Sequence, residues 1–398
     1  MRIRGRGNGS LRLLDRYIGI PLVFALGVLR RKRRIPSNPR NVGLLNTAAI
    51  GDTVLMSAVV ADLRERYCES AITLLVGPSN YQAACLIDGA DSVKRLPVLN
   101  PLASLREIRK HPFDLLLDFG PWSRLNALLT LCSRSSFTVG FRTGGEHRHF
   151  GYDIAVTHGD DVHELENHRR LVKALGVQTS HGPSLRYIQL HIGDGTSARQ
   201  RFAVVHMWPG GSGSELKEWP RERWLQVVKH LTATGYRIHL TGSREQFALN
   251  QSFIANMDAR LREFAENSAG LSLAETTYIL ARAQLVISVN TGVMHMAAAV
   301  GVPLVALHGP TNARRWGPVS DRAVSVESPL KGCGYLNLGF EFPRRCPPKC
   351  MEAITVEQVL AACQLAIERH SLESANVESR RNMKAGGLSG SGSSRTER

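Results

Sequence analysis

From residue 41 onward, the chain alternates short apolar runs with segments that have helical spacing. The first apolar runs are NVGLLN, AITLLVG, DLLLDFG and FTVGF, and helix-like segments such as LNALLTLCS separate them. The segment TVLMSAVVADLRERY is typical of a helix, because Met56, Val59 and Leu63 fall on one face. Strands that alternate with helices in this way predict a parallel sheet with both faces covered.

A second series of the same kind begins near residue 200. Its expected strands are FAVVHMW, YRIHLTGS, LVISVN and VPLVALHGP, and its expected helices include RERWLQVVKHLTATG, AETTYILARA and TGVMHMAAAVG. A polar stretch over 178–200 separates the two series. We therefore predict an α/β protein with an N-terminal domain over 41–185 and a C-terminal domain over 200–370. The length of 398 residues fits two hydrophobic cores better than one.

The two ends of the chain differ from these domains in composition. Residues 371–398 are rich in Gly, Ser and Arg and are expected to be disordered. Residues 1–40 form an arm with eleven Lys or Arg residues against one acid, so much of the formal net charge of +16 belongs to this arm. Charge gathered at one end bears on location more than on chemistry.

The arm combines an apolar run with a cationic block, YIGIPLVFALGVL followed by RRKRR. The run covers 17–29, which is shorter than the roughly 20 residues needed to cross a bilayer. No small-residue cleavage site follows it. We predict an anchor on the cytoplasmic face of the inner membrane, with a longer span, a signal peptide or a partner-binding arm as alternatives. Nucleic acid is not an expected partner, because the basic run lacks interleaved aromatic residues.

The cysteines and the bulk composition narrow the class of protein further. Apolar residues make up 43% and charged residues 21%, which is typical of a globular protein. Seven scattered cysteines favour a reducing compartment over a disulfide scaffold. Cys333, Cys346 and Cys350 are spaced too loosely for a usual zinc site, so a packed loop is favoured over a metal site. We expect no cofactor and no bound metal.

The segment SVNTGVMHM carries the strongest chemical signal. A buried strand leads to Asn290, a turn with Thr291 and Gly292 follows, and a helix starts at once. Free N–H groups at a helix start, together with the helix dipole, favour an anion. Gly292 would let a phosphate approach, and His295 lies one turn later. The structural alternative is an N-cap turn with a core-facing histidine.

Two further loops are candidates in the C-terminal domain. PGGSGSELK follows an expected strand, at the end where parallel sheets bind ligands, and supplies Gly211, Ser212 and Lys217. Lys217 could neutralise charge on a leaving diphosphate, or it could be a solvated lysine of an exposed loop. The second loop, after LTGS, contains Glu245.

In the N-terminal domain, TAAIGD places small residues and Asp52 just ahead of a helix. Asp52 could take a proton from an attacking hydroxyl, or it could be an N-cap. Arg142, Arg148 and Arg169, with His147 and His149, could contact an anionic acceptor, although a solvated face is the favoured interpretation.

Taken together, AAIGDTVLMSAVVADLRERY, KEWPRERW, LSLAETTYILARAQLVISVNTGVMHMAAAVGVPLVALHGPT and RWGP resemble the ADP-heptose:lipopolysaccharide heptosyltransferase family. The resemblance extends from about Asn41 to about Glu368. It implies a GT-B fold, with two Rossmann-like domains whose parallel sheets face a central cleft, and an inverting reaction without a bound metal.

The resemblance also implies roles for single residues. Asp52 matches the family's catalytic base, and Lys217 matches its phosphate-contacting lysine. Thr291, Gly292 and His295 match the turn that holds the donor diphosphate, while Glu245 matches an acidic donor contact.

The chain departs from the family pattern at three places. Asn290 stands where the family usually has an aspartate, and Asn46 and Thr47 stand where a basic residue commonly precedes the small-residue loop. The hydrophobic and basic arm is absent from the best-known members. These departures affect the expected donor and acceptor more than the expected fold.

The expected function is therefore the transfer of a sugar, heptose if the resemblance holds, from a nucleotide-diphosphate donor to a lipopolysaccharide-core or related envelope acceptor. The first alternative is a non-catalytic nucleotide-sugar-binding subunit, which Asn290 suggests. A sugar-nucleotide epimerase is a further alternative, but the sequence offers no second acid/base pair for it.

Overall fold

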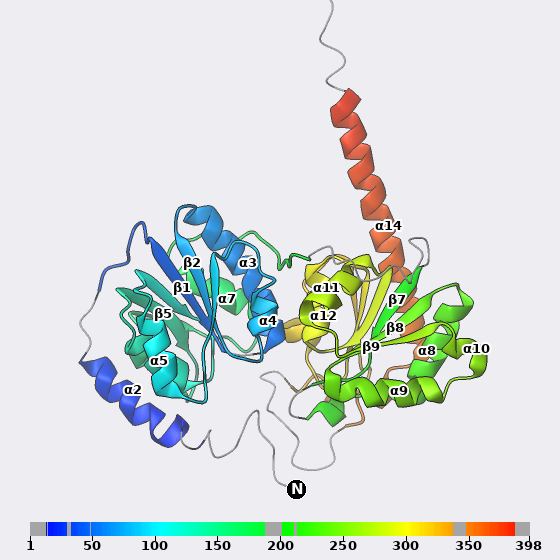
Figure 1. Ribbon diagram of the computed structural model, residues 1–398, viewed down its shortest axis with the longest axis horizontal. Helices are drawn as coiled ribbons and strands as arrows, with labels where there is room; N and C mark the ends of the chain where they lie inside the picture. Colours follow the sequence, from blue (N-terminus) through cyan, green and yellow to red (C-terminus); the bar gives the residue numbers. More distant parts are fainter. Residues whose placement is uncertain are drawn as a thin grey trace, which may run out of the picture.

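The computed structural model describes residues 13, 15–29, 33–47, 49–187, 201–210, 213–336 and 348–386. They form two lobes side by side, each built on a six-stranded sheet (Figure 1). The strands of the N-terminal sheet are β1 Asn41–Asn46, β2 Ala71–Val76, β3 Ser92–Arg95, β4 Leu115–Asp118, β5 Phe137–Arg142 and β6 Ile154–Thr157. Those of the C-terminal sheet are β7 Phe202–His206, β8 Arg237–Gly242, β9 Ala265–Ala269, β10 Leu285–Val289, β11 Leu304–His308 and β12 Ala323–Glu327.

Both sheets have the same topology. The N-terminal sheet has the order β3-β2-β1-β4-β5-β6, and the C-terminal sheet, counted from the other side, has the order β9-β8-β7-β10-β11-β12. The strand pairs are parallel in both sheets. This is the 3-2-1-4-5-6 order of the Rossmann fold. The prediction of two Rossmann-like domains is confirmed.

Helices cover the faces of both sheets. In the N-terminal domain they are α3 Ile50–Arg66, α4 Tyr81–Ala84, α5 Pro101–Arg109, α6 Arg124–Leu131, η1 Arg148–Gly151 and α7 Glu164–Lys173. In the C-terminal domain they are η2 Ser214–Lys217, α8 Arg221–Ala233, η3 Arg244–Gln246, α9 Phe247–Ala255, α10 Ala259–Arg262, α11 Leu273–Arg282, α12 Gly292–Ala299, α13 Ala313–Trp316, η4 Met351–Ala353 and α14 Val356–Gly386.

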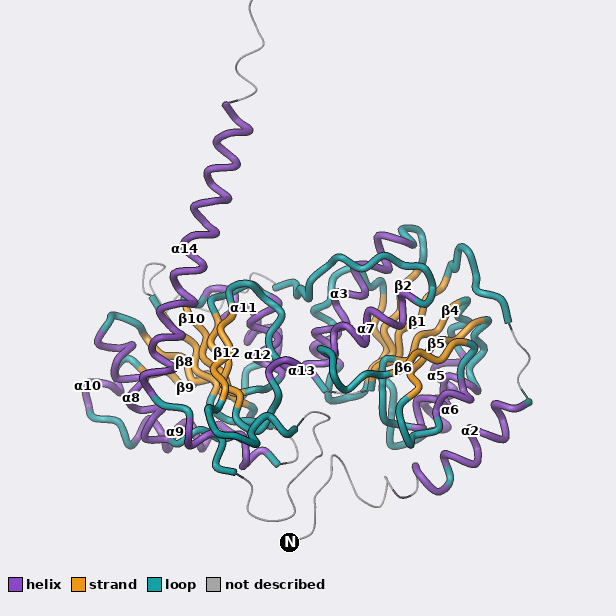
Figure 2. The backbone as a smooth tube through the Cα atoms, turned by 180° about the vertical axis from the view of Figure 1, so that it is seen from behind, coloured by secondary structure: helices purple, strands orange, loops and turns teal. Residues whose placement is uncertain are grey.

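The two domains share a continuous hydrophobic core where they meet. Val54 and Val59 of α3 belong to the same buried cluster as Met294 and Ala297 of α12. Figure 2 shows α13 between the two lobes, and α12 lies on the side of the C-terminal sheet that faces the N-terminal domain. Because apolar side chains of both domains pack into one cluster, the starts of α3 and α12 are held close together.

Helix α2 (Gly19–Val28) lies on the outer side of the N-terminal domain in both views (Figures 1 and 2). Val23 is buried against Ala127 and Tyr152, and the ring of Phe24 meets the ring of Phe150 edge to face. Within the described ranges, no helix combines the length and apolar content that crossing a membrane requires.

The prediction of a disordered tail from residue 371 is wrong for its described part. Helix α14 continues to Gly386 and projects away from the C-terminal domain (Figure 1). The stretch 371–385 contains no Gly or Pro, and eight of its fifteen residues are Leu, Glu, Arg, Ala or Lys, which are good helix formers, so nothing interrupts the helix before Gly386. Residues 387–398 lie outside the described residues.

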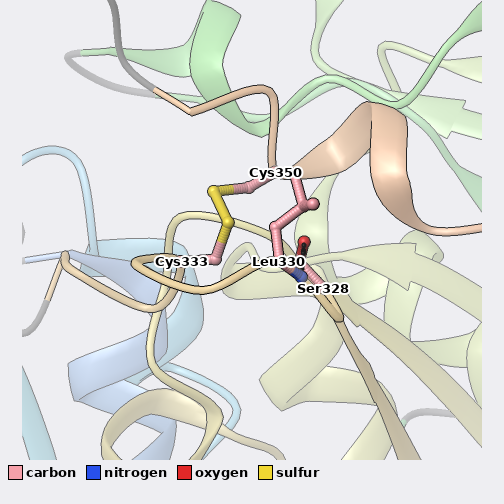
Figure 3. Close-up of a disulfide and its surroundings, with 4 residues drawn as sticks. All are labelled: Ser328, Leu330, Cys333 and Cys350. Carbon is pink, nitrogen blue, oxygen red and sulfur yellow. Dashed lines mark hydrogen bonds between the residues drawn. A yellow bond between two sulfur atoms is a disulfide. The ribbon is translucent and has the colours of Figure 1, made fainter.

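A disulfide joins Cys333 to Cys350, which corrects the expectation that the cysteines stay reduced (Figure 3). Their two Cα atoms lie 5.8 Å apart, a separation that disulfides favour. This proximity depends on the fold, so the spacing in sequence did not reveal it. Cys68, Cys85, Cys132 and Cys363 are free, and Cys346 lies outside the described residues.

Candidate active site at the domain interface

The turn after β10 starts α12 in the way the sequence predicts. Thr291 is the N-cap residue, its side chain makes no capping hydrogen bond, and the first turn holds no acidic residue. The N–H groups of this helix start are therefore suited to an anion. His295 is buried, and burial lowers its pKa to about 3, so its imidazole is neutral near pH 7. The sequence offered a core-facing histidine and an anion-binding helix start as alternatives. The structure has both, because His295 is buried and the start of α12 carries no side-chain cap.

Three neighbouring strands bring the other predicted donor residues to the same edge of the sheet. Strand β7 lies between β10 and β8, with Ser288 beside His206 and Val205 beside Leu240. The carboxyl ends of parallel strands share one edge, where open α/β sheets bind ligands. Each strand is followed by one of these residues: β10 by Thr291, β7 by Lys217 and β8 by Glu245.

Lys217 and Glu245 differ in their surroundings at this edge. Lys217 lies at the end of η2, and its Nζ donates to the Gly210 carbonyl at 3.2 Å. Glu245 lies in η3 and is exposed, and a hydrogen bond from Ser243 lowers the pKa of its carboxyl. Gly211 and Ser212 lie outside the described residues.

The start of α3 is in close contact with the start of α12. A Cβ atom added to Gly51 would lie 2.8 Å from Cδ2 of His295, and one added to Gly292 would lie 2.8 Å from Cβ of Ile50. Only glycines allow so close an approach. In this arrangement the missing side chain of Gly292 accommodates Ile50, whereas the sequence suggested room for a phosphate.

Asp52 belongs to the first turn of α3, two residues after Ile50, and is half-buried. It is not the N-cap, because that position is Ala49, so the N-cap interpretation of Asp52 is wrong. The backbone ahead of it is held by Asn80, whose amide donates to the Asn46 carbonyl at 2.9 Å and to the Thr53 hydroxyl at 2.7 Å. Asp52 therefore directly follows Ile50 and Gly51, the two residues that contact the start of α12.

Asn290 faces the segment that follows β11. Its amide donates to the Trp316 carbonyl at 3.0 Å and lies 3.4 Å from Nδ1 of His308. Burial lowers the pKa of His308 to about 4, so the imidazole is neutral near pH 7, and its Nδ1 accepts when the proton is on Nε2. An aspartate at 290 could not donate to a carbonyl, so the departure from the family pattern has a structural use here.

Three residues of this region were missed by the sequence analysis. His308 follows a buried apolar strand, as Asn290 does, and that position was a usable signal. Arg315 and Glu164 form a buried ion pair between the domains, with NH2 and Oε2 2.5 Å apart. They are 151 positions apart, and no local pattern links them.

Arg148 is not a residue that could contact an anionic acceptor. Its guanidinium is fully buried, forms an ion pair with Asp118 at 2.5 Å and donates to the Gly120 carbonyl. The hydroxyl of Tyr152 donates to the same carboxylate at 2.6 Å. This network lies within the N-terminal domain, so the solvated face expected of Arg148 is also wrong.

Among the described residues, no three His, Cys, Asp or Glu side chains are grouped so that they could hold a metal ion. With Cys333 and Cys350 in a disulfide, the loosely spaced cysteines offer no pair of thiolates at these positions.

A family model described as glycosyltransferase family 9 (heptosyltransferase) matches residues 102–334, which is more than half of the chain. Lipooligosaccharide heptosyltransferase 2 of Haemophilus influenzae is 32% identical over 124 residues, or 31% of this chain and 36% of that protein. The match thus spans about a third of that relative's length. The protein of the same name from Haemophilus ducreyi is 22% identical over 313 residues, covering 71% of this chain and 87% of that protein.

Solved structures share the fold. The Escherichia coli ADP-heptose lipopolysaccharide heptosyltransferase II superposes with a TM-score of 0.69 at 18% identity, covering 83% of this chain and 99% of that chain. An E. coli heptosyltransferase solved with ADP gives a TM-score of 0.64 at 18% identity, covering 82% and 99%.

Proposed function

This chain belongs to glycosyltransferase family 9, the heptosyltransferases, and on that premise we propose that it is an inverting glycosyltransferase. The donor would be a nucleotide-diphosphate sugar, ADP-heptose in the first place, and the acceptor a lipopolysaccharide-core or related envelope glycan. The names of the matched relatives and the ADP bound to one solved structure support this choice. The observation that carries the proposal is the contact between the start of α3, which bears Asp52, and the start of α12.

The proposed reaction uses each side of this contact for a different charge. Asp52 accepts the proton of an acceptor hydroxyl, whose oxygen then attacks the anomeric carbon from the side opposite the diphosphate. The bond from the anomeric carbon to the diphosphate oxygen breaks, and the nucleoside diphosphate leaves with the electron pair. Lys217 and the N–H groups near Thr291 stabilise the negative charge on the leaving group. Attack from the opposite face inverts the anomeric centre.

The test is an acceptor-dependent assay of nucleoside diphosphate release. The purified chain is incubated with ADP-heptose and with lipopolysaccharide that lacks heptose, and ADP release and acceptor mass are followed. We expect ADP release only with both substrates, and a mass gain of one heptose on the acceptor. Binding of ADP without any release would support the non-catalytic subunit instead. Conversion of the donor without acceptor would favour an epimerase.

We also propose that α2 holds the enzyme at an anionic membrane surface, on the cytoplasmic face of the inner membrane. Only Val23 and Gly19 of α2 are buried, while large apolar side chains on and beside it are exposed. Tyr17 is 71% and Leu29 is 80% exposed. The cationic residues of 30–34 follow directly, and each cation near anionic lipid contributes about 1 kcal/mol. Apolar insertion and charge would thus act together.

Flotation with lipid vesicles tests this second proposal. We expect the chain to bind vesicles that contain phosphatidylglycerol and to bind pure phosphatidylcholine vesicles weakly. The double variant Leu22→Ser/Leu26→Ser should lose most of this binding, because both side chains are exposed on α2. Leu99→Ser/Leu102→Ser is the matched control, since these leucines are also exposed but lie far from α2 in sequence. Equal binding by both double variants would refute a role for α2.

A further inference from the structure

Three consecutive residues of the C-terminal domain contact opposite sides of the domain interface. Arg315 and Gly317 contact the N-terminal domain. The carbonyl of Trp316, between them, accepts a hydrogen bond from Asn290 of the turn that starts α12 (residues 290–292, the donor turn). The segment 315–317 therefore touches both the N-terminal domain and the turn that starts α12. Figure 2 shows α13, which contains Arg315 and Trp316, between the lobes.

Arg315 is almost fully enclosed by the N-terminal domain. Its NH1 donates to the carbonyls of Gly159 at 2.9 Å and Val162 at 2.6 Å, and its NH2 pairs with Glu164 Oε2 at 2.5 Å. The two charged side chains are 1% and 2% exposed. An arginine that satisfies a carboxylate and two carbonyls in fixed geometry is held firmly, since its planar fork matches all three acceptors.

Gly317 contributes a second tie to the N-terminal domain. The Nε2 of His163 lies 3.0 Å from the Gly317 carbonyl, and its Nδ1 accepts from the Leu165 amide at 3.1 Å. These two contacts require the proton on Nε2, so the imidazole is a neutral donor. His163 is the N-cap of α7 and Glu164 is its first residue, so both ties reach one helix start.

We propose that Glu164 and Arg315 form a latch that holds the two domains in their closed arrangement. The bond from Asn290 to the Trp316 carbonyl makes α13 and the donor turn one rigid piece, so the latch that fixes α13 also fixes the turn against the start of α3. Arg315 and Glu164 are positioning residues, which keep Asp52 beside the donor site without touching substrate. Only the effect on turnover rests on the proposed function.

Another buried ion pair supplies a matched control. Arg148 and Asp118 are 2.5 Å apart and fully buried, like Arg315 and Glu164, but both lie within the N-terminal domain. Removal of either arginine leaves a buried carboxylate without its cationic partner, so both changes should lower stability by similar amounts. Only the change at Arg315 should separate the domains.

The experiment compares Arg315→Met with Arg148→Met in the full chain. We expect Arg315→Met to raise the radius of gyration in small-angle X-ray scattering and to lower kcat about tenfold, a barrier increase of about 1.4 kcal/mol. Its dissociation constant for ADP, measured by calorimetry, should change less than about threefold, because the donor turn stays intact. Arg148→Met should lower Tm and leave the radius of gyration unchanged.

Glu164→Gln and Arg315→Lys, which keep most of the side-chain volume, should give smaller changes of the same kind and serve if Arg315→Met does not fold. The latch is refuted if folded Arg315 and Glu164 variants keep the wild-type radius of gyration, or if Arg148→Met enlarges the molecule equally. Because scattering and ADP binding need no acceptor, an inactive wild-type chain would count against the proposed function and leave the latch testable.

Discussion

Helices α3 and α12 begin in similar ways in the two domains, yet they present opposite chemistry. Each follows a central strand of its sheet, and neither N-cap residue makes a side-chain capping bond. The first turn of α3 contains Asp52, whereas that of α12 has no acid and is followed by the neutral, buried His295. The same backbone arrangement can thus present a carboxylate or an anion-binding set of amides, depending on a few side chains.

The contact between the two helix starts also relates the two chemistries in space. Both approaches depend on glycine, Gly51 on one side and Gly292 on the other. A Rossmann-like domain alone would offer one of these helix starts. In the proposed reaction, their opposition across the interface brings the base and the leaving-group site to one substrate pair.

The largest effect is expected when the acid of α3 is neutralised. Asp52→Asn removes the proposed base with little change in shape, and general bases contribute about 10²–10⁴-fold to rate. We expect kcat to fall by about three orders of magnitude in the ADP-release assay, with ADP binding retained. Asp88→Asn, at an exposed carboxylate of the same domain, is the control. Normal turnover by Asp52→Asn would mean that the base is elsewhere.

Removal of Lys217, the cation that follows β7, should have the next largest effect. His295 is neutral near pH 7, so the start of α12 offers only its N–H groups to an anion. In the proposed reaction, Lys217 supplies the positive charge for the leaving diphosphate. Lys217→Met should lower kcat by about 10²-fold, the size seen when one transition-state donor is lost. Lys217→Arg should retain more of the rate than Lys217→Met. An equal loss in both would indicate a role other than charge.

A side chain added between the helix starts should separate them. The Cβ of Gly292→Ala would lie 2.8 Å from Ile50, so the domains must move apart, and we expect about a tenfold loss of kcat. The double variant Ile50→Gly/Gly292→Ala, which removes the Cβ of residue 50, should recover activity. Gly182→Ala, where a Cβ would meet nothing within 4 Å, is the control. Failure of the double variant to recover would argue against the contact.

The smallest effect concerns pH and two buried imidazoles, His295 of α12 and His308 at the end of β11. Burial lowers the pKa of His295 to about 3 and of His308 to about 4, whereas an unfolded histidine titrates near about 6.5. Below about pH 6.5 the unfolded chain binds protons that the folded chain excludes. The free energy of unfolding should therefore decrease as the pH is lowered, by up to about 1.4 kcal/mol per pH unit for each group.

Urea unfolding between pH 7.5 and pH 5 measures this slope. His295→Gln should remove one group from the titration and reduce the slope by up to about 1.4 kcal/mol per pH unit. A slope that stays the same in this variant would mean that His295 is protonated in the folded state at these pH values.

The expected strands were found in the middle of each sheet and missed at its edges. The eight strands read from the sequence are the central ones, whereas β3, β6, β9 and β12 are the edge strands. A central strand such as β10 is buried along its whole length and appears as an unbroken apolar run. An edge strand such as β3 is only half-buried, and its sequence SVKR carries no such run.

The amino-acid sequence by itself determined the central strands and the residues at their carboxyl ends, because burial and helix starts leave local patterns. Asp52, Lys217 and Thr291 were identified in this way. Only the tertiary structure decided which residues meet across the fold: Ile50 and Gly292, Arg315 and Glu164, and Cys333 and Cys350. These pairs are distant in the chain and depend on how the folded segments pack, so no spacing in the sequence encodes them.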